Sequence, residues 1–301
     1  MVRMSGYAKG TRKPKKGLAI KDLDIGGVKI KPAVAIVSLM AALYVIFLPG
    51  ARLESGLDAL ILAIFSFAIF AALAYLVRSG SVAGLKPFAL LIDAFLALSA
   101  LSLVQAFAMF LNIYGPAVDL TAPRLAFIMT VNAATAAILL MAIMYFEKEA
   151  REGIYLKASP LRVTLLGLTV FVACGLIAIG AAYLFLGSTA SMLAALNVLV
   201  FGLFGGVYEE ALFRGLLLSR LRQVLSVNYA LAIQAIVFGV FEALAVYVFF
   251  PNLLVLPAVL VAGALLGYFL GMITLKNESI LAPQLIHGGL YMLLAIPLLM
   301  A

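Results

Sequence analysis

Three charged residues, Glu209, Glu210 and Arg214, interrupt the apolar run FGLFGGVYEEALFRGLLLSRLR. A charge at the centre of a bilayer costs about 2.5–3.5 kcal/mol on insertion scales. Glu210 and Arg214 are four residues apart, so they share one helical face and can pair. Glu209 points about 100° away and needs another neighbour. The stretch predicts either a structural ion pair or a polar site inside the membrane.

Two later apolar segments also carry ionisable side chains. Glu242 lies in VFGVFEALAVY, and His287, the only histidine of the chain, lies in APQLIHGGLYML. A shared polar pocket would satisfy these groups together with Glu209, and such a pocket can activate water through a carboxylate. Asp93, a lone acid in LLIDAFLAL, is more simply interpreted as a hydrogen-bonding residue between helices.

The elements that must position these residues are membrane helices. The chain has 301 residues, of which 66% are hydrophobic and 11% are charged, whereas soluble proteins are about half apolar and a quarter charged. Its apolar runs can cross a hydrocarbon core of about 30 Å, and they lack the alternation of barrel strands. We expect an all-α polytopic membrane bundle of about 8–9 transmembrane helices, from hydrophobic segments at residues 33–50, 57–77, 86–113, 124–146, 161–187, 191–218, 227–250, 253–275 and 279–300.

Charge is concentrated at the N-terminus. Residues 1–32 hold nine Lys and Arg against two Asp, which accounts for +7 of the net charge of +8. Beside a membrane span, a cytoplasmic tail attracted to anionic headgroups is a simpler interpretation than a nucleic-acid partner. Basic residues in the alternate loops favour the same orientation, with a cytoplasmic N-terminus in a multi-pass cell-membrane protein. We therefore divide the chain into a basic tail (1–32), N-terminal spans (33–187) and a C-terminal core (188–301).

Small residues predict close helix packing in that core. Gly263, Gly267 and Gly271 form G-x-x-x-G-x-x-x-G, a common helix-contact face, on the segment between Glu242 and His287. The single cysteine excludes an intrachain disulfide and a Cys-rich zinc site.

The C-terminal core resembles the CPBP intramembrane protease family, which includes the type II CAAX prenyl endopeptidases and Abi-like bacteriocin-immunity proteins. EEALFRG resembles the first motif, E-E-x-x-x-R. Phe238 and Glu242 have the spacing of the second motif, F-x-x-x-H, but Glu242 replaces its histidine. His287 resembles the start of the third motif, with Tyr291 where Asn or a small polar residue is common. The resemblance covers roughly residues 190–300.

This resemblance implies an eight-helix bundle with a conical polar cavity in the C-terminal half, open to cytoplasm and membrane. It implies hydrolysis of peptide bonds, with membrane lipid around the protein and peptide or protein substrates that include prenylated C-terminal tails. Glu209 would be the general base, and Glu210 and Arg214 a supporting pair. His287 would polarise water or stabilise the oxyanion.

The glutamate at position 242, in place of the histidine of the motif, leaves several hypotheses open. Two carboxylates in one dry cavity disfavour a double charge, so a protonated Glu242 could be the acid beside the base Glu209. The sequence requires no cofactor, but Glu209, Glu242 and His287 could hold a divalent metal such as Zn²⁺. The chain could instead be an inactive membrane scaffold or immunity protein. A transporter with a proton- or ion-coupled site formed by Asp93, Glu209 and Glu242 is a further alternative, although broken-helix Gly/Pro pairs in related halves are missing.

Overall fold

The computed structural model of the protein describes residues 23–25, 28–47, 56–111, 122–147, 151–186, 188–249 and 253–296. Most of the expected basic tail, residues 1–22 and 26–27, lies outside the described residues. Two short strands at its end, β1 (Leu23–Ile25) and β2 (Val28–Ile30), pair antiparallel. This hairpin was not expected from the sequence, and it precedes the first helix.

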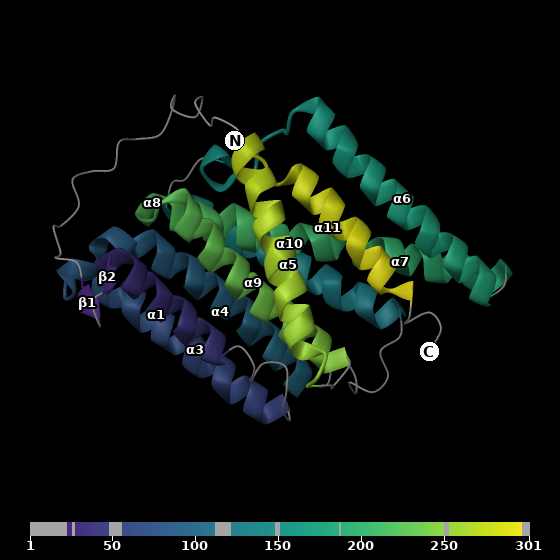
Figure 1. Cartoon of the computed structure of the whole chain (residues 1–301). Helices are drawn as coiled ribbons and strands as arrows, with labels where there is room; N and C mark the ends of the chain where they lie inside the picture. The colour runs from purple at the N-terminus through teal and green to yellow at the C-terminus, as the bar shows by residue number, and fades with distance from the viewer. Residues whose placement is uncertain are drawn as a thin grey trace.

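The expected helical bundle is confirmed (Figure 1). Its long helices are α1 (Pro32–Phe47), α3 (Gly56–Arg78), α4 (Ala89–Phe110), α5 (Ala122–Glu147), α6 (Leu161–Leu186), α7 (Ser188–Glu209), α9 (Val227–Phe249), α10 (Leu256–Asn277) and α11 (Leu281–Leu294). Shorter elements are η1 (Ala83–Phe88), η2 (Arg151–Ile154), η3 (Glu210–Leu218) and α8 (Ser219–Val224). Seven helices in the described part are long and apolar enough to cross a membrane, so the chain is a multi-pass membrane protein.

The segment that carries the charged motif lies at the centre of the bundle. α7, η3 and α8 follow one another without a break, and η3 is a π-helix in which every residue is buried. α7 packs against α5, α6 and α11, while η3 contacts α4, α5, α9 and α10. π-helical turns inside α-helices are rare and occur frequently at functional sites.

The expected glycine face of α10 packs against α9. A methyl group at Gly263 would lie 3.1 Å from Glu242 Cβ, and one at Gly267 would lie 2.9 Å from Phe238 Cδ1. These glycines let α10 approach α9 closely at the turns that present Phe238 and Glu242.

A second glycine contact joins α7 to α11. A methyl group at Gly206 would lie 2.5 Å from the carbonyl oxygen of Gln284 and 2.7 Å from the amide nitrogen of Gly288. The two backbones therefore touch one turn before Glu209 and beside His287. This contact sets the distance between the acidic pair and the histidine.

A short connection between α5 and α6 packs against η3. Ile154 is fully buried, and its carbonyl oxygen lies close to Gly215 of η3. The Ile280 amide donates to the Tyr155 carbonyl at 3.2 Å, and the Ser279 hydroxyl donates to the Lys157 carbonyl at 2.6 Å. The connection thereby links the start of α11 to the π-helix.

We predict that Gly206→Ala destabilises the protein, because its methyl group meets backbone atoms that cannot rotate away. Overpacking of this kind costs about 1–3 kcal/mol. Gly180→Ala is the matched control, since Gly180 lies in α6 with no other atom within 4 Å of an added methyl. Thermal unfolding in detergent should show a lower Tm for the first variant and an unchanged or higher Tm for the second. Equal Tm values would contradict the close contact between α7 and α11.

Candidate active site

The candidate site contains a buried ion pair at the start of η3. Glu210 and Arg214 are both fully buried, and Arg214 Nη1 lies 2.8 Å from Glu210 Oε1. The N–H direction does not meet hydrogen-bond geometry, so the contact is an ion pair without a directed hydrogen bond. The guanidinium lies over the Phe238 ring, 4.0 Å from its centroid, which adds a cation–π contact.

The same glutamate also holds the histidine. His287 Nδ1 lies 2.9 Å from Glu210 Oε1, so this carboxylate joins Arg214 to His287. The imidazole stacks on Tyr291 at 4.8 Å and meets Phe238 edge-on at 5.5 Å. With Nδ1 bound to a carboxylate paired with Arg214, the proton is best placed on Nδ1. Nε2 then faces Glu209, 3.7 Å from its Oε2 atom.

Glu209 is held by two tyrosines through one of its oxygens. The hydroxyls of Tyr208 and Tyr291 donate to Glu209 Oε1 at 2.5 and 2.6 Å. The other oxygen, Oε2, is buried and makes no hydrogen bond within the described ranges. A carboxylate fixed through one oxygen, with the other directed at a histidine, has the form of a positioned acceptor.

Glu242 completes the cluster from α9. Its side chain is buried, and Glu242 Oε1 lies 3.1 Å from the Tyr291 hydroxyl oxygen. Ligand atoms of Glu209, Glu242 and His287 lie within 4.8 Å of one another. The structure thus brings together all six candidate residues, from α7, η3, α9 and α11. Tyr208 was missed; its only signal in the sequence is a hydroxyl directly before the acidic pair.

The three ligand atoms are nearly close enough for a metal ion. Zinc bonds to carboxylate oxygen and imidazole nitrogen measure about 2.0–2.2 Å, so two ligand atoms can be at most about 4.4 Å apart. A separation of up to 4.8 Å would need to close by a few tenths of an ångström. The unpartnered Glu209 Oε2 is a suitable donor for such an ion. The donor set therefore fits a divalent metal after a small inward shift.

Other expected polar residues lie apart from this cluster. Asp93 forms an ion pair with Arg78 between α3 and α4, with both carboxylate oxygens 2.7–2.8 Å from Nη2. A cavity of about 500 Å³ lies in that N-terminal half, between α3, α4 and α5. The conical cavity around Glu209 stays a prediction.

Comparison with known proteins identifies one family. Residues 190–293 match the model of the type II CAAX prenyl endopeptidase Rce1-like family. The match covers about a third of the chain and contains all six candidate residues. It confirms the family resemblance found from the motifs. Neither a curated protein nor a solved structure gives a significant match.

We predict strong energetic coupling between Glu210 and Arg214. Removing one partner of a buried pair leaves an uncompensated charge and costs about 3–5 kcal/mol. Glu210→Gln and Arg214→Met should therefore each lower the free energy of unfolding by such an amount, and the double variant should lose less than the sum. Lys157→Met is the control, because its pair with Glu278 is partly exposed and contributes about 0–1 kcal/mol. Additive losses in a double-mutant cycle would contradict the coupling.

Proposed function

We propose that this chain, whose residues 190–293 match the Rce1-like family, is an intramembrane endopeptidase that uses Glu209 to activate water. One observation carries the proposal: Glu209 Oε2 is buried, makes no hydrogen bond within the described ranges and faces His287 Nε2 at 3.7 Å. A water that contacts both atoms from the side would have Glu209 Oε2 as one proton acceptor and His287 Nε2 as the other.

The proposed reaction begins when Glu209 Oε2 takes a proton from water and the oxygen attacks the scissile carbonyl carbon. The C–O bond forms as the carbonyl π bond opens to an oxyanion. Collapse of this intermediate breaks the C–N bond, and the amine leaves with a proton from a carboxylic acid. Glu209, which has received one proton, or Glu242 can supply it.

Glu242 is suited to the acid role by its contact with Tyr291. A tyrosine hydroxyl has one proton, and the 2.6 Å contact directs it to Glu209. The 3.1 Å contact between the Tyr291 and Glu242 oxygens is then best made if Glu242 carries a proton and donates it. A protonated Glu242 would therefore replace the histidine of the second motif as a donor. It could give that proton to the oxyanion or to the leaving amine.

The supporting residues act by position. Glu210 orients the imidazole through Nδ1, and Arg214 pairs with Glu210 inside the bundle. The Tyr208 and Tyr291 hydroxyls fix the Glu209 carboxylate so that Oε2 alone is available. A base fixed in this way avoids the reorganisation that a mobile carboxylate would need.

We further propose that the substrates are peptide segments at the membrane surface, including prenylated C-terminal tails, and that the N-terminus is cytoplasmic. The family match and the membrane helices support a peptide substrate that reaches the site from the bilayer. The excess of basic residues in the first 32 positions supports the orientation.

A divalent metal held by Glu209, Glu242 and His287 is the second form of the same proposal. The ion would supply Lewis-acid activation of the water, and Glu242 would then be a ligand instead of an acid. Metal content of the purified protein and its change with chelator separate the two forms without an activity assay. A catalytically inactive scaffold or immunity protein is the alternative function, because Glu242 departs from the family motif.

Glu209→Gln should abolish peptide cleavage, with a loss of at least about a hundredfold, because the amide cannot accept the proton of water. Glu278→Gln is the matched control: its side chain is 58% exposed and far along the chain from the motif. Cleavage of lipidated and unlipidated peptides by purified protein in detergent measures the effect. Retained cleavage in Glu209→Gln, with normal folding, would exclude this base.

Glu242→His restores the family motif and tests the departure directly. If Glu242 is the acid, the variant should retain cleavage, with an altered pH profile because imidazole and carboxylic acid titrate in different ranges. A wild-type protein without cleavage and a Glu242→His variant with cleavage would favour the inactive scaffold. The same pair measured with and without chelator reports whether either protein needs a metal.

A further inference from the structure

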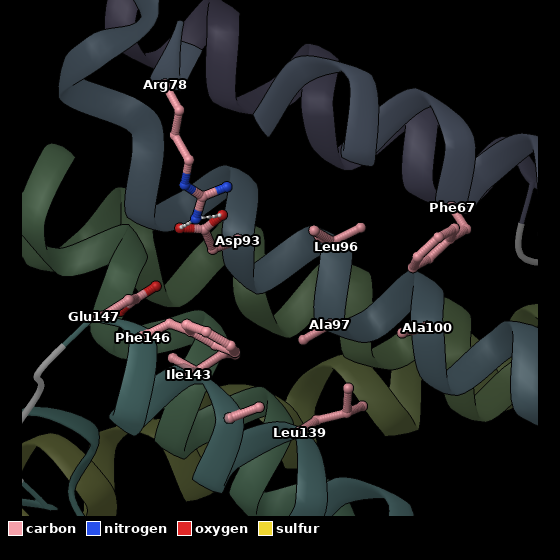
Figure 2. A pocket seen from close by; sticks show the side chains of 11 residues that line it. Phe67, Arg78, Asp93, Leu96, Ala97, Ala100, Leu139, Ile143, Phe146 and Glu147 are labelled. Carbon is pink, nitrogen blue, oxygen red and sulfur yellow. Dashed lines mark hydrogen bonds and ion pairs between the residues drawn. The ribbon is translucent and has the colours of Figure 1, made fainter. Parts of the chain in front are cut away.

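A cavity of about 500 Å³ lies in the N-terminal half, in a region that the candidate active site does not use. α3 and α5 both pack against α4, and the cavity lies between these three helices. Figure 2 shows Arg78, Asp93 and Glu147 at one end, and Phe67, Ala100 and Leu139 toward the other. A volume of this size is typical of ligand sites, which measure about 300–1,000 Å³.

The cavity is long and apolar, with charge only at one end. The helix rise of 1.5 Å per residue places Phe67 about 16 Å from Arg78 along α3, and Leu139 about 12 Å from Glu147 along α5. Between these ends, the wall consists of alanine and larger apolar side chains, namely Leu96, Ala97, Ala100, Leu139, Ala142, Ile143 and Phe146. This shape and polarity match an amphiphile that has a straight hydrocarbon chain and a polar head.

The charged end offers donors to an anionic head. Arg78 contacts Asp93 through Nη2 alone, at 2.7 and 2.8 Å. The Arg78 side chain is 58% exposed, whereas that of Asp93 is 10% exposed. Asp93 therefore fixes the guanidinium from the protein side, and the other donors of the fork remain for a phosphate. Glu147, also at this end, is paired with Arg220 at 2.7 Å, so its charge is compensated.

The surroundings favour a lipid of the bilayer over a peptide substrate. Phe146, on the cavity wall, is 76% exposed, and the neighbouring α5 residues Ile138 and Met141 are also exposed, as expected for a face in hydrocarbon. α5 also packs against α7, the helix that ends at Glu209. The cavity shares no lining residue with the catalytic cluster. A lipid chain held here would therefore not occupy the proposed catalytic site.

We propose that this cavity binds one acyl chain of an anionic phospholipid, with the headgroup phosphate on Arg78. The bound lipid fills the space that α3, α4 and α5 leave open and so stabilises their arrangement. Because Glu147 lines the cavity and pairs with Arg220 of α8, the lipid also supports the helix end that follows the catalytic π-helix. The proposal concerns the N-terminal spans and does not depend on protease activity.

The absence of tryptophan from the chain allows a direct test. Phe67→Trp places the only indole at the apolar end of the cavity, and Leu184→Trp places one on the exposed face of α6 as a control for bulk lipid. Each is reconstituted in phosphatidylcholine bilayers with increasing fractions of phosphatidylglycerol that carries bromine in its acyl chain. Phe67→Trp should be quenched at a lower brominated fraction than Leu184→Trp. Phe146→Trp is a second reporter at the rim, should Phe67→Trp fail to fold.

Two further variants separate the chain from the headgroup. Ala100→Phe fills the cavity and should return the Phe67→Trp quenching curve to that of the control. Arg78→Gln with Asp93→Asn removes both charges together and should lower the preference for phosphatidylglycerol over brominated phosphatidylcholine roughly fivefold, the effect of one basic residue near a membrane surface. In the protein without the Ala100→Phe substitution, phosphatidylglycerol should also raise the Tm more than phosphatidylcholine does.

Three results would overturn the proposal. Identical quenching curves for Phe67→Trp and Leu184→Trp would mean that the cavity holds no specific lipid. Equal quenching by the brominated forms of both phospholipids would remove the preference for an anionic headgroup at Arg78. Relief of quenching by a farnesylated peptide, but not by unbrominated phosphatidylglycerol, would assign the cavity to a lipidated peptide instead.

Discussion

The carboxylate of Glu210 is the constraint on which the rest of the C-terminal half depends. It is fully buried in an apolar bundle and contacts Arg214 and His287 through the same oxygen atom. A buried carboxylate persists only where charged or hydrogen-bonding partners surround it. Those partners come from the next turn of its own helix and from α11, so the fold must bring α11 within hydrogen-bond distance of η3. The ion pair is therefore a condition on helix packing as well as on electrostatics.

The glycines meet that condition. Gly206 removes the side chain that would separate α7 from α11, and Gly263 does the same between α10 and α9. One contact lies a turn before the acidic pair, and the other lies directly beside Glu242. Because interfaces between membrane helices gain most from close packing, small residues at these points place polar groups accurately without help from the hydrophobic effect. The positions of the polar groups in the cluster thus depend on the glycine contacts.

The sequence predicted the bundle, the glycine face of α10 and the residues that gather around Glu209. The charged residues could be predicted because a charge in an apolar span is costly and can be stabilised in few ways. It did not predict the π-helix, since i→i+5 bonding leaves no clear pattern in EALFRGLLL. Nor did it predict that His287 binds Glu210 through Nδ1. The spacing of residues within one helix does not show how α11 is rotated relative to η3. Tyr208 was missed because a tyrosine in an apolar span is usually a packing residue. The N-terminal cavity was missed because a space between three helices has no local signature in the sequence.

The replacement of histidine by Glu242 can be understood from the charge balance of the cluster. Three carboxyl groups, Glu209, Glu210 and Glu242, share the buried space with one arginine and one histidine. Arg214 is already committed to Glu210, and His287 has one nitrogen bound there as well. The remaining two carboxyl groups meet at the Tyr291 hydroxyl, which has a single proton to donate. A shared proton or a bound cation relieves the same excess of negative charge, and each gives Glu242 a chemical role that a histidine could also fill. The substitution therefore changes how the charge is balanced while leaving a proton acceptor, Glu209 Oε2, directed into the cluster.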